Sequence, residues 1–243
     1  MLKAVIWSAR TGICALAVLT ATALWPAVAQ NQNIGKAVVV VSNVTGTVQA
    51  VSRQVVINDN VEQQEVIATA PDAATEIHFI DGTKIKLGPN AKVVLDKFVY
   101  DPDPSKGALV LTISEGVLRF TTGNMSHEDY KINTPNGTLG VRGTELNVLV
   151  TNGETITQVL NGEVVGNSAK GGLQIFNPGA CFSINGNPGL ASYFNSCSGS
   201  ELDTINTLAS LMDNILLNPT GGPGPPPPPP FQFNVFLPPT SPF

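Results

Sequence analysis

The segments TPNGTLGVRGT, residues 134–144, and FIDGTKIKLGPN, residues 79–90, decide the fold. In both segments, short runs with alternating apolar residues are interrupted by glycine, a pattern typical of strands that turn tightly. Neither segment contains a nucleophile with its base, a cysteine and histidine cluster or a phosphate-binding loop. The two segments therefore predict an all-β fold and argue against an enzyme.

The same pattern of short strands extends over residues 35–190, which we predict to form one β domain. Turn signals occur at Asn152-Gly153, Asn161-Gly162 and Asn185-Gly186, because Asn and Gly tolerate a positive φ. About 150 residues are enough to bury a core. The candidate strands are 38–41, 47–51, 76–80, 84–87, 93–99, 108–113, 117–120, 144–150, 155–160 and 163–165.

The turn at Asp81-Gly82 predicts the register of one hairpin. Residues that face each other across a hairpin share one side of the sheet, so apolar residues should meet apolar residues. A two-residue loop would place Phe79 opposite Lys84, so we expect a three-residue loop instead. The pairs expected from that loop are Phe79 with Ile85, Ile77 with Leu87 and, on the outer face, His78 with Lys86.

Residues 1–29 have the composition of a cleaved export signal. Lys3 and Arg10 supply a positive start, Gly12 to Leu24 is apolar, and Ala27-Val28-Ala29 is a small-x-small cleavage pattern. A retained anchor is the alternative, but the apolar run, about 13 residues, is shorter than the roughly 20 that a membrane helix needs. No later stretch is apolar enough to span a bilayer, so the mature chain is predicted to lack a transmembrane segment.

Removal of residues 1–29 leaves 11 basic and 18 acidic residues, a net charge of about −7. Nucleic-acid binding depends on basic contacts to phosphate, so this acidic balance predicts no nucleic-acid partner.

Cys181 and Cys197 are the cysteines left after export. In an oxidising compartment an isolated pair of this kind predicts a disulfide, with two buried free thiols as the alternative. Lipidation of Cys14 is the weaker interpretation of the third cysteine, because Thr11-Gly12-Ile13 lacks the upstream Leu of a lipoprotein site.

Two further segments follow the β domain. Residues 200–218 predict an amphipathic helix that covers one end or edge of the sheet, with partner binding or membrane-surface binding as alternatives. Its apolar residues are Leu202, Ile205, Leu208, Leu211, Met212, Ile215 and Leu216. Residues 219–243 hold 11 of the 19 prolines and predict a disordered, polyproline spacer. The tip beyond the prolines, with Phe231, Phe233, Val235, Phe236 and Phe243, is either disordered or a docking tag.

Candidate chemistry is sparse, and we expect no catalytic residue, cofactor or metal. His78 and His127 are interpreted as surface histidines, and Ser126, His127 and Glu128 alternate sides in extended chain instead of converging. Asp101 and Asp103 lack the further oxygen ligands that calcium needs, so a rigid connection is preferred to a calcium site. Arg142 is expected to fold inward and donate to turn carbonyls, with ligand binding as the alternative.

Several segments together resemble the FecR domain of bacterial envelope proteins, over about residues 38–165. The matching segments are Phe79–Thr83, Leu87–Asn90, Gly116–Phe120, Tyr130–Pro135 and Gly140–Thr144. The resemblance implies an all-β domain, solenoid-like or sandwich-like, with no known catalytic site. The motif positions treated as architectural are Asp81, Gly82, Gly88, Pro135, Gly140, Arg142, Gly143 and Thr144.

The best-known members of that family are membrane-spanning regulators that relay siderophore-receptor signals to an extracytoplasmic-function sigma factor. This chain has an export signal where those regulators have a sigma-binding segment and a membrane span. We therefore expect an exported, non-enzymatic module, periplasmic or at the cell surface, that binds or scaffolds an envelope protein. The alternative is a component of a transenvelope signalling system that senses a partner and regulates a sigma-factor pathway.

Overall fold

The computed structural model describes residues 32–101, 107–126, 130–151, 153–168, 172–185 and 193–218. All of them belong to the second of two compact units, Asn31–Phe243. The predicted signal, residues 1–29, and the proline-rich segment, residues 219–243, lie outside the described residues, as do His127 and Asp103.

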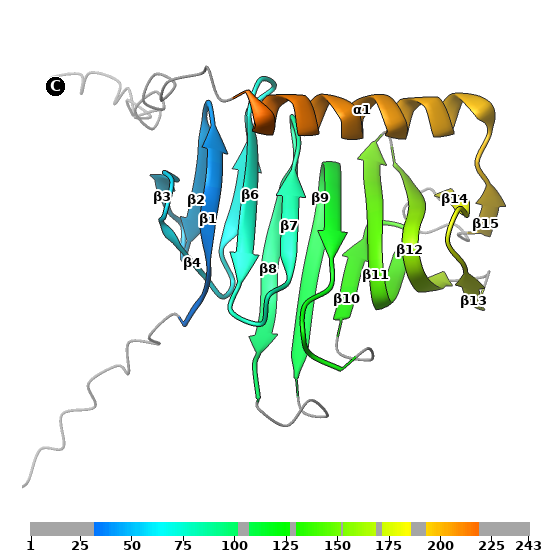
Figure 1. Cartoon of the computed structure of the whole chain (residues 1–243), viewed down its shortest axis with the longest axis horizontal. Helices are drawn as coiled ribbons and strands as arrows, with labels where there is room; N and C mark the ends of the chain where they lie inside the picture. Colours follow the sequence, from blue (N-terminus) through cyan, green and yellow to red (C-terminus); the bar gives the residue numbers. More distant parts are fainter. Residues whose placement is uncertain are drawn as a thin grey trace, which may run out of the picture. The chain divides into compact units, whose positions relative to one another are not determined.

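The described residues form fifteen strands followed by one helix, which confirms the predicted mostly β fold with a C-terminal helix (Figure 1). The elements are β1 Asn33–Val41, β2 Val44–Val48, β3 Val51–Gln54, β4 Asn60–Glu62, β5 Val66–Thr69, β6 Ala74–Phe79, β7 Lys84–Leu87, β8 Lys92–Val99, β9 Ala108–Thr121, β10 Tyr130–Thr134, β11 Gly137–Thr151, β12 Glu154–Ser168, β13 Gly172–Phe176, β14 Cys181–Asn185, β15 Tyr193–Ser196 and α1 Gly199–Leu217.

The strands belong to one hydrogen-bonded sheet that is not closed and has two arms. The helix-side arm runs from β4 through β1, β6 and β7 to residues 116–121 of β9, then through residues 145–151 of β11 and 154–159 of β12 to β14 and β15. The far arm comprises β3, β2, β5, β8, the first half of β9, β10, the first half of β11, the second half of β12, and β13. Strands β9, β11 and β12 therefore contribute to both arms.

These three long strands bend where the sequence predicted turns. Gly116 has φ +87° in β9, and Gly162 has φ +74° in β12. In β11 the pairing register shifts between Arg142 and Glu145, around Gly143 with φ +57°. Because an L side chain strongly disfavours these angles, glycine lets the strands kink without ending. The predicted strand pairs 108–113 with 117–120 and 155–160 with 163–165 are consequently single strands.

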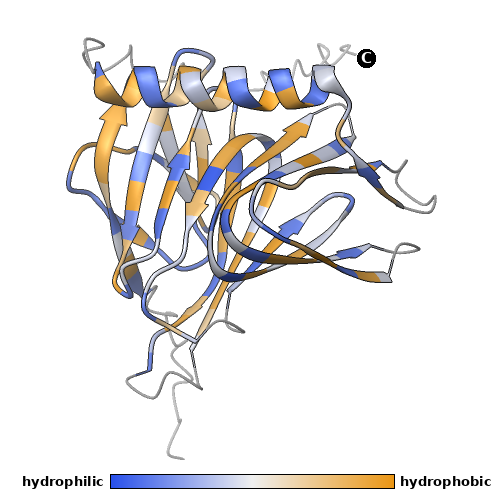
Figure 2. Ribbon diagram, turned by 45° about the vertical axis from the view of Figure 1, so that its right-hand side comes forward, coloured by the Kyte–Doolittle hydropathy of each residue, from blue (hydrophilic) through white to orange (hydrophobic). Residues whose placement is uncertain are grey.

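One apolar cluster fills the space between the two arms. Phe79 of β6 stacks on Phe98 of β8 at 5.9 Å between ring centroids, and Phe120 meets Tyr130 edge to face, also at 5.9 Å. Hydrophobic and hydrophilic residues alternate along many strands in Figure 2, as expected when one side of a sheet packs on a core. Burial of this cluster is the main stabilising contribution to the fold.

The hairpin around Asp81 has the predicted faces but not the predicted register. Ile77 pairs with Ile85, Thr75 with Leu87, and His78 with Lys84. The predicted register was wrong: each residue of β6 pairs with the residue two positions before the expected one in β7. A shift of two residues leaves every side chain on the same face, so alternation alone does not distinguish the two registers.

Helix α1 confirms the predicted amphipathic helix, one residue earlier at each end. Ser198 is the N-cap, and it forms a capping box with Glu201. The helix lies across the outer face of the helix-side arm near one end of its strands and contacts β9, β6, β1, β11 and β12 (Figure 1). Its buried residues are Ile205, Ala209, Met212 and Leu216, which pack on Ala74, Val117, Leu149 and Ile156. Leu211, which was expected on the apolar face, is exposed.

A second apolar cluster lies between α1 and the sheet. Because of it, strand β11 is buried on both faces near its end. Leu146, Val148 and Val150 face the main core, while Leu149 faces α1. None of the helices in the described part of the chain is both long and apolar enough to cross a membrane.

Candidate functional site

Six polar side chains line a pocket on the outer face of the helix-side arm. They are Glu76 of β6, Lys84 and Lys86 of β7, Arg119 and Thr121 of β9, and Glu145 of β11, around a cavity of about 260 Å³. Alternation along the strands places them there, because each neighbour in the chain points to the core. Arg119, for example, lies between Leu118 and Phe120, which are fully buried.

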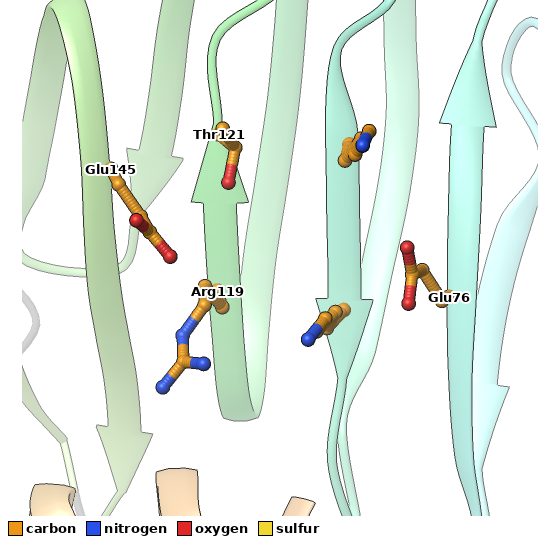
Figure 3. A pocket seen from close by; sticks show the side chains of 6 residues that line it. Glu76, Arg119, Thr121 and Glu145 are labelled. Carbon is orange, nitrogen blue, oxygen red and sulfur yellow. The ribbon is translucent and has the colours of Figure 1, made fainter. Parts of the chain in front are cut away.

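The strand register arranges these side chains in two rows. Glu76 lies opposite Lys86, and Lys86 lies opposite Arg119. In the next row Lys84 lies opposite Thr121, and Thr121 lies opposite Glu145. Figure 3 shows Glu76 and Glu145 on opposite sides of the pocket, with Arg119 and Thr121 between them. The pocket floor therefore carries interspersed positive and negative groups.

Asp213 of helix α1 contacts two of the lining residues. This carboxylate accepts hydrogen bonds from Arg119 Nη1 at 2.6 Å and from Lys86 Nζ at 3.1 Å. Arg119 Nε also donates to Asn147 Oδ1 at 2.9 Å. Burial opposes the charge, but the hydrogen bonds from Lys86 and Arg119 hold the pKa of Asp213 below its ordinary value. Lys86 and Arg119 are thus held in place by intramolecular contacts.

Lys84 and Glu145 differ from these fixed groups. Among the residues that the structure describes, neither forms a side-chain hydrogen bond or an ion pair, and Lys84 is exposed. Glu76 contacts His78, whose Nε2 lies 2.6 Å from Glu76 Oε1. The pocket therefore offers one lysine and one glutamate, on either side of Thr121 in the same row, to a ligand from outside.

Strands β6 and β11 are three strand spacings apart, or roughly 14 Å, so the backbones of Glu76 and Glu145 lie on opposite sides of the pocket. Within the described ranges, no group of three or more His, Cys, Asp or Glu side chains could hold a metal ion.

This pocket was not predicted from the sequence, although the alternation of charged and buried residues indicated an outer face with charged groups. Each of its charged residues alternates with buried apolar neighbours along a strand, as Lys84 and Lys86 do around Ile85. Finding the site also requires knowing that β7 lies beside β9 and β9 beside β11, strands far apart in the chain.

Among the motif residues, Asp81 is buried in the turn between β6 and β7. Its carboxylate accepts hydrogen bonds from the Thr83 hydroxyl, from the Thr83 backbone N–H at 3.1 Å and from Tyr130 Oη at 2.9 Å. Tyr130 Oη in turn accepts from the backbone N–H of Met125 at 3.0 Å. Burial raises the pKa of Tyr130 to about 12. The network joins the β6–β7 turn to the start of β10.

Thr144 and Gly88 also occupy tightly packed positions. Thr144 Oγ1 donates to the Glu163 carbonyl at 2.8 Å and accepts from the Arg142 backbone N–H at 3.0 Å, across the bend of β11. A Cβ on Gly88 would lie 2.4 Å from Cγ1 of Val117 and 3.1 Å from Cβ of Met212. Glycine at residue 88 thus lets β9 and α1 approach the chain.

The remaining motif residues have less distinctive positions. Gly82 has φ +86° in the hairpin turn, and Pro135 lies in the turn between β10 and β11. Gly140 lies within β11, where an added Cβ would be at ordinary van der Waals distance from Val165. Arg142 does not fold inward: its side chain is 50% exposed and lies 3.5 Å from Glu163. Its outward direction follows from the strand alternation on either side of the bend.

The predicted disulfide between Cys181 and Cys197 is present, with 5.4 Å between the Cα atoms. Cys181 begins β14, and Cys197 immediately precedes the N-cap of α1. The bond therefore ties the start of the helix to the sheet.

Comparison with known proteins identifies one family. Residues 65–165 match the family model described as FecR protein. The search of curated proteins finds no match. Two crystal structures of a candidate anti-sigma factor from Parabacteroides distasonis are similar, each with a TM-score of 0.44 and with 16% and 15% identity. In both cases the similarity covers 57% of this chain and 62% of that chain, which is less than two thirds of its length.

Proposed function

Because residues 65–165 form a FecR domain, we propose that this protein is a non-enzymatic component of a transenvelope signalling system. In this role it binds a protein partner outside the cytoplasm and regulates an extracytoplasmic-function sigma-factor pathway. The observation that carries the proposal is that all six residues lining the outer-face pocket fall inside the matched segment. The family match favours this role over a pure scaffold.

The charge pattern of the pocket supports recognition of a protein. Lys84 and Glu145 are available for intermolecular pairs, while Asp213 holds Lys86 and Arg119 in position. Complementary charges at an interface improve specificity and the rate of association. The partner we propose presents a carboxylate to Lys84 and a cationic group to Glu145.

Several other features are consistent with a role in the envelope. The disulfide between Cys181 and Cys197 fits an oxidising compartment. We propose that residues 1–29 direct export to the periplasm or cell surface and that the two arms form a sandwich-like body. Apolar packing between the arms supports this architecture over a solenoid.

A scaffolding role at the cell surface is the second candidate. It is favoured by strand β13, where Leu173 and Ile175 are exposed side by side on the outer face of a sheet edge. A scaffold would hold other envelope proteins together without changing transcription, which separates it from the first candidate.

Transcription in the bacterium that encodes the protein tests the signalling role. The gene is deleted and complemented with the wild type, with the charge swap Lys84→Glu plus Glu145→Lys, or with Lys97→Glu. Lys97 is an exposed control on β8. We expect deletion and the charge swap to change sigma-factor-dependent transcripts alike, while Lys97→Glu restores the wild-type level. If deletion leaves every such transcript unchanged, the signalling role is wrong and the scaffold remains.

A further inference from the structure

Among the described residues, strand β13 is a sheet edge with one free side. In the described part of the chain it pairs with β12 alone. Its sequence, GLQIF, has no charged residue, and four of its five residues are exposed. Leu173 is 73% exposed and Ile175 is 63% exposed. Free edges in soluble proteins usually carry a charge, a proline or a bulge that blocks further pairing, and β13 has none of these.

The opposite side of β13 is anchored in an aromatic cluster. Phe176 stacks on Phe182 at 3.6 Å between ring centroids and contacts Phe194 at 5.3 Å. Phe182 is fully buried. The edge is therefore held in a fixed position, so binding of an added strand would not require β13 to become ordered first. Ile175 also lies opposite Val165 of β12, which extends the apolar surface beside the edge.

The chain itself contains a segment that matches this edge. Residues 231–236, FQFNVF, carry no charge, and Phe231, Phe233 and Val235 alternate as in a strand with one apolar face. Both β13 and this segment are uncharged, so their pairing brings no like charges together. Twelve residues, eight of them prolines, separate the segment from Asn218. The apolar tip thus lies beyond a spacer instead of directly at the helix end.

The position of the spacer favours binding of residues 231–236 to the β13 edge of a second copy over binding to the edge of the same copy. Helix α1 begins beside β15 and ends on the side of β1 and β6, away from β13 (Figure 1). Consecutive prolines favour a stiff, extended conformation, which disfavours a return across the molecule.

We propose that the β13 edge of one copy binds residues 231–236 of a second copy as an added strand. Main-chain hydrogen bonds would supply affinity, and the row of Leu173 and Ile175 would receive the alternating Phe231, Phe233 and Val235. The two contacting surfaces differ, so the interface is heterologous, and a bound pair keeps one free edge on one copy and one free tail on the other. The expected assembly is an open-ended series of oligomers.

Mass measurement on the full-length exported protein tests this inference. Size-exclusion chromatography with light scattering should show species larger than a dimer that grow with protein concentration. Ile175→Lys should block pairing at the β13 edge, and Phe233→Lys should block binding by the tail. Each variant should therefore be monomeric. The controls Val51→Lys and Phe243→Lys should still associate. Val51 is 72% exposed on β3, another strand with a single partner, and Phe243 lies outside the proposed strand.

Mixing the two monomeric variants distinguishes lost binding from misfolding. Ile175→Lys retains a tail and Phe233→Lys retains an edge, so an equimolar mixture should double the mass and stop at a 1:1 dimer. Wild-type protein that stays monomeric at all concentrations would overturn the proposal. So would association that survives Phe233→Lys, which indicates pairing between β13 edges, or a mixture that remains monomeric. None of these results depends on sigma-factor regulation.

Discussion

Asp213 of α1 accepts a hydrogen bond from Arg119 of β9 at 2.6 Å, across 94 positions of sequence. The same carboxylate accepts a hydrogen bond from Lys86 of β7. One helix residue thus joins two neighbouring strands through side chains that line the charged pocket. The position of α1 and the shape of the proposed binding site are therefore coupled.

The first prediction is that Asp213→Asn destabilises the protein by about 2 kcal/mol, because hydrogen bonds to charged groups contribute that order of free energy. Urea unfolding measures the loss. Asp203→Asn is the matched control, since Asp203 lies on the exposed face of the same helix. Equal stability of the two variants would show that the contact between Asp213 and the strands contributes nothing.

The second prediction concerns pH. Hydrogen bonds from Lys86 and Arg119 lower the pKa of folded Asp213 below its ordinary value of 3.8, against the effect of burial. A lowered pKa in the folded state means that the stabilisation is complete above pH about 4 and is lost as the pH falls through the folded value. The difference in melting temperature between wild type and Asp213→Asn should therefore be constant from pH 7 to about pH 5 and shrink by pH 2. A difference that grows in acid would contradict this sign.

The third prediction is that Gly88→Ala destabilises the protein by roughly 1 to 3 kcal/mol, the usual cost of overpacking. The new Cβ would lie 2.4 Å from Cγ1 of Val117. Thermal unfolding measures the effect, and Gly199→Ala is the control because a Cβ there would meet nothing within 4 Å. In a Val117→Ala background Gly88→Ala should cost less, since the colliding methyl group is absent there. Full stability of Gly88→Ala would rule out the close approach.

The fourth prediction is that Asp81→Asn destabilises the protein by about 1 to 3 kcal/mol. The amide replaces one acceptor oxygen by an NH2 donor, so either the Thr83 backbone N–H or the Thr83 and Tyr130 hydroxyls lose their acceptor. Tyr130→Phe should also destabilise, and the double variant should lose less than the sum of the two. Chemical denaturation of all four proteins gives this coupling. Additive losses would mean that the Asp81 and Tyr130 side chains act independently.

The fifth prediction is that Cys181→Ser with Cys197→Ser lowers stability by about 3 kcal/mol, from the loop-entropy account of a disulfide. The bond ties the start of α1 to β14, so we expect helical circular dichroism to be lost at a lower temperature than in the wild type. Reducing agent should reproduce the effect in the wild type and leave the double variant unchanged. A melting temperature that does not respond to reduction would contradict the prediction.

The local sequence was sufficient to predict several elements and insufficient for others. Strand β7 and the helix were predicted nearly to their ends, because each has a clear period and clear boundary residues. Six strands, β4, β5, β10, β13, β14 and β15, were missed. Between 47 and 51 a single strand was expected, but Gln49 and Ala50 have positive φ and form the turn between β2 and β3.

Sequence alone determined which faces are apolar, where the chain bends and which cysteines pair, because these depend on residue type and on short-range periodicity. Tertiary structure decided that the bends at Gly116 and Gly162 fold continuous strands instead of ending them, and that the hairpin register is set by the buried Asp81 turn. It also decided that Arg142 points outward, while Arg119 lines the pocket and pairs with Asp213. These outcomes depend on which strands become neighbours, and contacts between residues distant in sequence leave no periodic signal in the chain.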